Sequence, residues 1–73
     1  MDIKHLTHIV ALADKRNFAR AAEQLNLSQP ALSRSIKSLE DELGQPLFDR
    51  IGRKNELTAF GQHIVAHAQS LVD

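Results

Sequence analysis

The sequence predicts a mainly α-helical domain with one short two-stranded β-hairpin, and three observations support this fold class. Apolar residues recur at spacings of three and four along most of the 73-residue chain, which is the period of a helix with one buried face. Aspartate, asparagine, serine or threonine precedes each such stretch, and these residues cap helices by accepting hydrogen bonds from backbone N–H groups. Around residues 47–58 the helical period stops and a glycine intervenes, which is typical of a hairpin.

Length and composition restrict the kind of protein. A domain of 73 residues buries only about 60% of the surface that its unfolded chain exposes. The chain has no cysteine, so neither a disulfide nor a thiolate metal site can brace this small core. The longest apolar run covers residues 9–13, far fewer than the roughly 20 residues that a membrane span needs. We therefore expect one cytoplasmic domain with no membrane partner.

The first two helices are predicted over residues 2–15 and 18–25. Asp2 and Asn17 are suited to cap their starts, and Asn26 tolerates the left-handed conformation that ends a helix. One face of the second helix carries Phe18, Ala21, Ala22 and Leu25. Because alanine side chains are small, another helix can approach this face closely.

The third helix, over residues 29–43, has the clearest amphipathic pattern. Ser28 is its predicted cap, and Pro30 is tolerated because N–H groups of the first turn have no partner within the helix. The apolar residues follow at spacings of four, three and four, as Leu32, Ile36, Leu39 and Leu43. Gly44 and Pro46 then end the helix.

The hairpin and a last helix complete the predicted fold. Residues 47–50 and 55–58 are expected to pair around a turn in which Gly52 can take a positive φ. Thr58 then begins a helix over residues 59–73, whose apolar stripe is broader than one core face needs. Half of that stripe is expected to pack inside and half against a second copy of the chain.

Two of the predicted helices satisfy the helix-turn-helix plan, since only residues 26–28 separate them. If the Leu32 stripe of residues 29–43 packs inward, the opposite face must point to solvent, and Gln29 lies exposed at its leading end. That face carries Pro30, Ser33, Arg34 and Lys37. Arginine can bind guanine, glutamine can bind adenine, and lysine suits phosphate oxygens. Because the major groove admits one α-helix, we expect double-stranded DNA as the partner.

The order of the charges favours this interpretation more than their sum does. The net charge is zero, and a nucleic-acid binder usually has a basic balance. However, Lys15–Lys37 contains five basic residues and one acid, Glu23. A second basic group is Arg50, Arg53 and Lys54, while three acids at residues 40–42 are expected to form a solvated patch. The alternative is a set of ordinary solvated charges.

The chain resembles the N-terminal domain of LysR-type transcriptional regulators. The resemblance lies in Phe18-x-x-Ala21-Ala22-x-x-Leu25, Ser28-Gln29-Pro30-Ala31-Leu32-Ser33, Ile36-x-x-Leu39-Glu40-x-x-Leu43-Gly44, Leu47-Phe48-x-Arg50 and Leu57-Thr58-x-x-Gly61. It runs from Met1 almost to Asp73 without a gap. It implies a bacterial winged helix-turn-helix, with a three-helix core and a two-stranded wing, that binds promoter DNA as a homodimer. Helix 29–43 would enter the major groove, and the wing at residues 48–57 would meet the minor groove.

The resemblance also assigns roles to residues by position. It implies base contacts by Gln29, Pro30, Ser33, Arg34 and, in the minor groove, Arg53. It implies phosphate contact, or support of the wing, by Ser28, Lys37, Arg50 and Thr58. The position of Lys54 beside Arg53 at the hairpin tip favours a phosphate contact for it as well. For both tip residues, the alternative is a charged edge that blocks strand addition. Ala19 departs from the family, which often has serine or threonine there.

The resemblance divides the chain into a DNA-binding domain over residues 1–58 and the start of a linker and dimerisation helix over residues 59–73. The residues expected to pair two copies are Ile64, Val65, Ala68, Leu71 and Val72. Family members carry a larger C-terminal domain that binds a small-molecule effector, and these 73 residues contain no counterpart of it. The chain is therefore either an excised fragment or a stand-alone head.

Other functions have weaker support. The broad apolar stripe of residues 59–73 leaves open a protein-interaction or dimerisation module. The histidine pairs His5/His8 and His63/His67 have helical spacing but no nearby carboxylate or thiol ligand, so solvated histidines without metal are expected. No glycine-rich phosphate loop or catalytic triad is present. We therefore expect no enzymatic activity and no cofactor.

Overall fold

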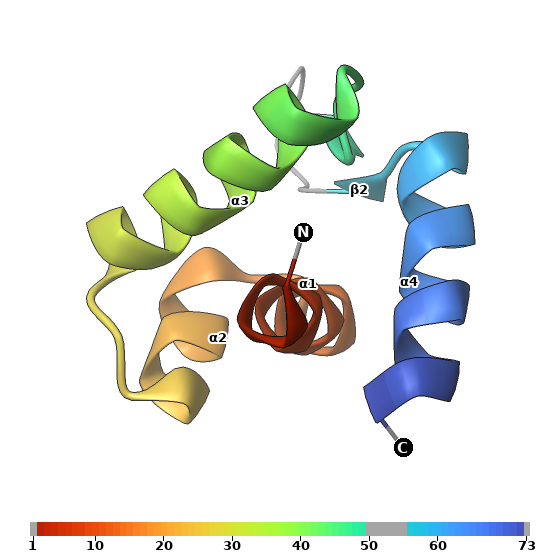
Figure 1. Cartoon of the computed structure of the whole chain (residues 1–73). Coiled ribbons are helices and arrows are strands. Elements are labelled where there is room, and N and C mark those ends of the chain that lie inside the picture. Colours follow the sequence, from red (N-terminus) through yellow and green to blue (C-terminus); the bar gives the residue numbers. More distant parts are fainter. Residues whose placement is uncertain (1, 50–55, 73) are drawn as a thin grey trace.

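The computed structural model describes residues 2–49 and 56–72, with the side chains described as far as residue 70. This part of the chain is mainly helical, as predicted, and it contains a two-stranded antiparallel sheet. The elements are α1 (Ile3–Lys15), α2 (Phe18–Leu25), α3 (Gln29–Leu43), β1 (Phe48–Asp49), β2 (Glu56–Leu57) and α4 (Ala59–Val72) (Figure 1). No helix among the described residues is long and apolar enough to cross a membrane.

The predicted caps begin all four of these helices. The side chains of Asp2, Asn17 and Ser28 each accept a hydrogen bond from the backbone N–H three residues later, at 3.0, 3.0 and 3.1 Å. Thr58 Oγ1 accepts one in the same way from the N–H of Gly61, at 2.9 Å. These short-range bonds satisfy N–H groups that have no partner within the helix, so they explain why the helix starts could be predicted.

Left-handed residues end the first three helices. Asn26 and Gly44 have φ angles of 59° and 76°, as predicted from residue type. Arg16 ends α1 with a φ of 53°, which the sequence did not indicate, because arginine rarely adopts this conformation. Each of these residues donates its backbone N–H to a carbonyl of the last helical turn.

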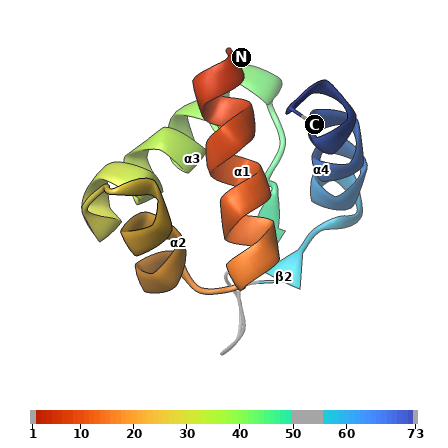
Figure 2. The ribbon, with the colours of Figure 1, turned by 90° about the horizontal axis from the view of Figure 1, so that it is seen from below.

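Helix α1 is the centre of the domain. Figure 1 looks along it and Figure 2 shows it lengthwise, with α2 and α3 on one side and α4 on the other. The largest fully buried side chains come from α1, α3 and the segment before β1, and they are Ile9, Leu12, Leu32, Ile36, Leu39 and Leu47. One small core therefore fixes α3 and α4 against the same central helix.

The hairpin is shorter than predicted. Phe48 pairs with Leu57 and Asp49 pairs with Glu56. Leu47 was expected to lie inside the first strand, but its N–H donates to the side chain of Glu40 at 2.7 Å, so the strand begins one residue later. Residues 50–55, which include the predicted turn, lie outside the described part of the chain.

His8 is part of the contact between α1 and α3. Its side chain is buried, and Nδ1 lies 2.7 Å from Oγ of Ser35. The expectation that all the histidines are solvated was therefore wrong for His8, which lies on the face of α1 that α3 covers. His63 and His67 are exposed, as predicted. Burial lowers the pKa of His8, and the positive charges of Lys4 and His5 act in the same direction.

The lowered pKa of His8 predicts a loss of stability in acid. Between the pKa in the folded chain and the ordinary value of 6.5, the unfolded chain binds more protons than the folded one. The contribution of neutral His8 to the unfolding free energy is therefore complete at a pH above its ordinary pKa of 6.5. It decreases as the pH falls towards the pKa of His8 in the folded chain. Urea denaturation across this range should show the decrease in the unfolding free energy.

The matched variants for this experiment are His8→Gln and His63→Gln. The first keeps a polar side chain near Ser35 but cannot titrate, so its unfolding free energy should lack the acid step. The second changes an exposed histidine and should keep the step. Equal pH dependence in His8→Gln and the wild type would contradict the prediction.

Candidate nucleic-acid interface

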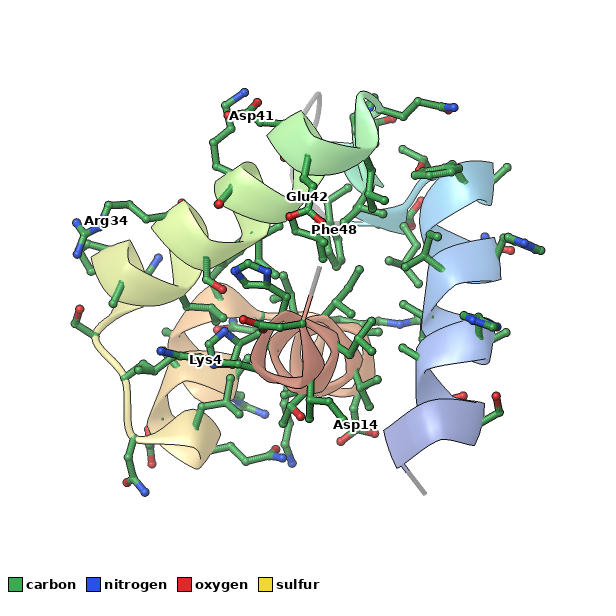
Figure 3. The ribbon with its side chains drawn as sticks, in the orientation of Figure 1. Lys4, Asp14, Arg34, Asp41, Glu42 and Phe48 are labelled. Atoms are coloured by element: carbon green, nitrogen blue, oxygen red, sulfur yellow. The ribbon has the colours of Figure 1, made fainter. Side chains whose placement is uncertain are left out.

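The residues of α3 that were predicted to contact bases lie on its solvent side. Leu32, Ile36 and Leu39 are fully buried, whereas Gln29 at the leading end of the helix is exposed. A shallow groove runs along the opposite side of the helix, lined by Pro30, Ser33, Arg34, Lys37, Ser38 and Asp41. We call these six residues the outer face of α3. Figure 3 labels Arg34 and Asp41 there, pointing away from the core.

Sequence reasoning missed two members of this face, Ser38 and Asp41. The signal was present, because they follow Arg34 by four and seven residues, and residues at this spacing share one side of a helix. Asp41 Oδ1 accepts a hydrogen bond from Lys37 Nζ at 2.9 Å. Both side chains of this ion pair are 65% exposed. The outer face thus carries two cations and one carboxylate.

Helix α2 supports α3 through close packing. Ala21 and Ala22 are buried, and their small side chains let the neighbouring helices, α1 and α3, approach α2 closely. Between the helices, Leu27 donates its N–H to the carbonyl of Ala22 at 2.8 Å and packs against the core. Ser28, one of the predicted phosphate contacts, is exposed and caps α3. The backbone geometry is that of the predicted helix-turn-helix.

The prediction that residues 40–42 form a solvated acidic patch is wrong for Glu40. Its side chain is only 6% exposed, and its Oε2 accepts hydrogen bonds from the N–H groups of Leu47 at 2.7 Å and Phe48 at 3.4 Å. The chain turns after α3 and returns across this side of the helix, which brings two backbone donors to the carboxylate. The sequence predicted that all three acids are exposed, and of the three only Asp41 and Glu42 are.

The peptide of Leu47 joins α3, the hairpin and α4. Its N–H donates to Glu40, and its carbonyl accepts a hydrogen bond from the N–H of Thr58 at 3.0 Å. Thr58 Oγ1 donates to the carbonyl of Pro46 at 2.9 Å, so this half-buried side chain holds the base of the hairpin. Gly61 approaches the Leu47 carbonyl so closely that a Cβ at this position would overlap it.

The hairpin also contacts α2, because the rings of Phe18 and Phe48 lie 6.3 Å apart between centroids. Figure 3 shows Phe48 directed into the interior below α3. The predicted tip residues Arg50, Arg53 and Lys54 lie outside the described residues. The roles that the resemblance implies for them stay predictions.

Two of the five residues predicted to pair two copies through α4 are not available at the surface. Val65 and Ala68 are buried in the core of their own chain, because the side of α4 that carries them faces α1. Phe60 and Ile64 are half-buried and pack at the edge of the same core. The side chains of Leu71 and Val72 lie outside the described residues.

The described residues contain no group of three or more potential metal ligands among histidine, aspartate and glutamate.

Lys15 and Arg20 line a second shallow groove, between the end of α1 and α2, together with Glu23 and Gln24. The basic residues between Lys15 and Lys37 are exposed, which both interpretations of the charges predict.

Comparison with known proteins identifies the family. The family model "Bacterial regulatory helix-turn-helix protein, lysR family" matches residues 3–62. The SDS degradation transcriptional activation protein of a Pseudomonas species is 56% identical over 72 residues, which cover 99% of this chain and 24% of that protein. The HTH-type transcriptional regulator IlvR of Caulobacter vibrioides is 49% identical over 67 residues, covering 92% of this chain and 23% of the relative. The chain thus spans about a quarter of the length of these relatives.

Solved structures have the same fold. The DNA-binding domain of BenM, in a complex with benA site 1 DNA, matches with a TM-score of 0.95 and 38% identity, covering 99% of this chain and 81% of that one. The CbnR domain in its DNA complex matches with a TM-score of 0.92 and 36% identity, over 99% and 83% of the two chains. A full-length OxyR variant from Pseudomonas aeruginosa matches with a TM-score of 0.94 and 46% identity, over 99% and 24%. These likenesses confirm the predicted winged helix-turn-helix fold.

Removal of the Glu40 carboxylate is expected to destabilise the fold. In Glu40→Ala, the buried N–H of Leu47 loses its acceptor, and an unsatisfied buried donor costs about 1–3 kcal/mol. Urea denaturation at neutral pH measures the loss of unfolding free energy. Glu23→Ala is the matched control, because it removes an exposed glutamate from a helix. Equal losses in the two variants would rule out a stabilising role for the Glu40 hydrogen bonds.

Proposed function

Because the chain belongs to the lysR family of bacterial regulatory helix-turn-helix proteins, we propose that it binds double-stranded promoter DNA and thereby regulates transcription. One observation carries the proposal: Leu32, Ile36 and Leu39 on the inner side of α3 are fully buried, Leu43 is partly buried, and the outer face is open to solvent. An exposed helix face of this kind fits the major groove. The related BenM and CbnR domains, whose structures contain DNA, support the same choice of partner.

The outer face has the chemistry for two kinds of contact. Arg34 can donate two hydrogen bonds to guanine, Gln29 can bind adenine, and Ser33 can bond several base edges. Pro30 adds an apolar contact beside them. Lys37 and Ser28 suit phosphate oxygens. In this proposal base contacts supply the discrimination between sequences, and phosphate contacts supply much of the affinity.

The wing is proposed to meet the minor groove. Arg53 would enter the groove, and Arg50 and Lys54 would contact phosphates. Support comes from the base of the hairpin. Glu40 on α3 accepts a hydrogen bond from the N–H of Leu47, and the N–H of Thr58, at the start of α4, donates to the carbonyl of Leu47. These contacts hold the described strands of the hairpin close to α3.

We further propose that residues 1–58 form the DNA-binding unit and that α4 begins a linker through which two copies pair. The half-buried edge of α4 at Phe60 and Ile64 supports this surface, with Leu71 and Val72 as further members of the predicted stripe. A two-fold dimer would place its two α3 helices about one DNA turn, or a multiple of it, apart. A small-molecule effector would bind outside these 73 residues, since the relatives are about four times as long.

Two variants of the outer face should separate base contacts from phosphate contacts. Arg34→Ala should lose about 1–3 kcal/mol of discrimination at one base position. Lys37→Ala should instead weaken binding to all sequences alike and make the salt dependence shallower. The measurement is a set of binding isotherms on a duplex selected from a random library and on its scrambled version. Identical behaviour of the two variants would contradict the assignment.

Salt distinguishes this function from a protein-interaction module, which the apolar edge of α4 favours. Binding through phosphates should fall steeply between about 50 and 200 mM salt, because each contact releases counterions from DNA. An apolar interface buries few charges and should barely respond. A chain whose only measurable association is insensitive to salt would therefore overturn the proposed function.

A further inference from the structure

The Lys37–Asp41 ion pair places a carboxylate at the C-terminal end of the outer face of α3, the surface that is proposed to meet DNA. Both residues line the same groove as Arg34, and the ammonium and the carboxylate are 2.9 Å apart. DNA is a polyanion, so an exposed carboxylate on this face opposes binding. Its presence calls for an explanation in terms of either the stability of the helix or the interface.

Helix stability does not provide that explanation. Asp41 lies in the last turn of α3, where the helix dipole disfavours a negative charge. The order of the pair, with lysine four residues before the acid, is also the less favourable one. Exposed ion pairs contribute only about 0.2–1 kcal/mol, and both side chains here are 65% exposed. The pair is therefore a weak contributor to the fold.

Glu40, the acid next to Asp41, has a different role. Glu40 lies in the same turn, but its carboxylate is buried and accepts hydrogen bonds from the backbone of Leu47 and Phe48. The partner that the structure gives to Asp41 is instead Lys37, the cation that the proposed function assigns to phosphate contact. Asp41 and a DNA phosphate thus compete for one ammonium group.

We propose that Asp41 restrains the sequence-independent affinity of the domain for DNA by holding the ammonium group of Lys37. The inference rests on the proposed function and adds a residue that works against phosphate binding. Non-specific binding comes almost entirely from contacts between cations and phosphates. A carboxylate that occupies one of those cations therefore weakens binding to every sequence, and it does so without touching a base.

The test is Asp41→Asn in the full natural chain, with a fluorescent duplex of random sequence as the probe. Loss of the Asp41 contact should make the Lys37 ammonium more available to phosphate, raising the affinity about 1.5–5-fold and steepening the slope of log affinity against log salt by part of the roughly 0.9 that one full phosphate contact contributes. Thermal unfolding should be unchanged, because the pair contributes little to the fold. Unchanged affinity and slope would overturn the proposal.

Two controls make the result specific. Asp14→Asn makes the same charge change at an exposed carboxylate beside Lys15, and Figure 3 shows Asp14 beyond α1, on the side away from the outer face of α3. It should leave affinity and slope almost unchanged, so an equal gain in this variant would mean that only net charge matters. In a Lys37→Ala background Asp41→Asn should have little effect, whereas persistence of the full gain would overturn the proposed restraint.

The experiment also separates this inference from the proposed function. If the wild-type chain binds duplexes in a salt-dependent manner and Asp41→Asn behaves like it, only the restraint is wrong. If the wild-type chain binds no duplex at any salt concentration, the proposed function fails and the restraint fails with it.

Discussion

The peptide group of Leu47 is the constraint on which the arrangement of the other elements depends. Its N–H is bound by the buried carboxylate of Glu40 on α3, and its carbonyl is bound by Thr58 at the start of α4. Gly61 completes the contact, because the carbonyl occupies the space of a Cβ. One peptide group thus joins α3, the strands of the hairpin and the start of α4, and these polar contacts add to the apolar packing of a small core.

Those features of the fold that depend on neighbouring residues could be predicted from sequence. A cap such as Ser28 bonds to a backbone group three residues away, and the spacing of Leu32, Ile36 and Leu39 fixes which side of α3 is apolar. For the same reason the exposure of Arg34 could be predicted, since a helix that buries one side must expose the other. The part of the candidate site on α3 could be predicted because it lies on a single helix.

Features that depend on distant segments could not be predicted. Glu40 and His8 have side chains that are polar and usually exposed, and they are buried here because the segment after α3 and the side of α3 itself cover them. Val65 and Ala68 belong to an apolar stripe on α4, but the sequence does not say which half of that stripe faces α1. In each case the deciding partner comes from a different element, and no local pattern identifies it.

The zero net charge of the chain shows why charge must be assigned to surfaces before it is used as an argument. Two of the carboxylates bond to the backbone of their own chain, Asp2 as a cap and Glu40 as an anchor of the hairpin. A third, Asp41, holds a lysine on the outer face of α3. The local electrostatic field is set by the groups on each surface, and on the outer face of α3, which is proposed to meet DNA, Arg34 and Lys37 outnumber one acid. A neutral chain can therefore present a weakly cationic outer face on α3, and the size of that cationic excess depends on a single carboxylate.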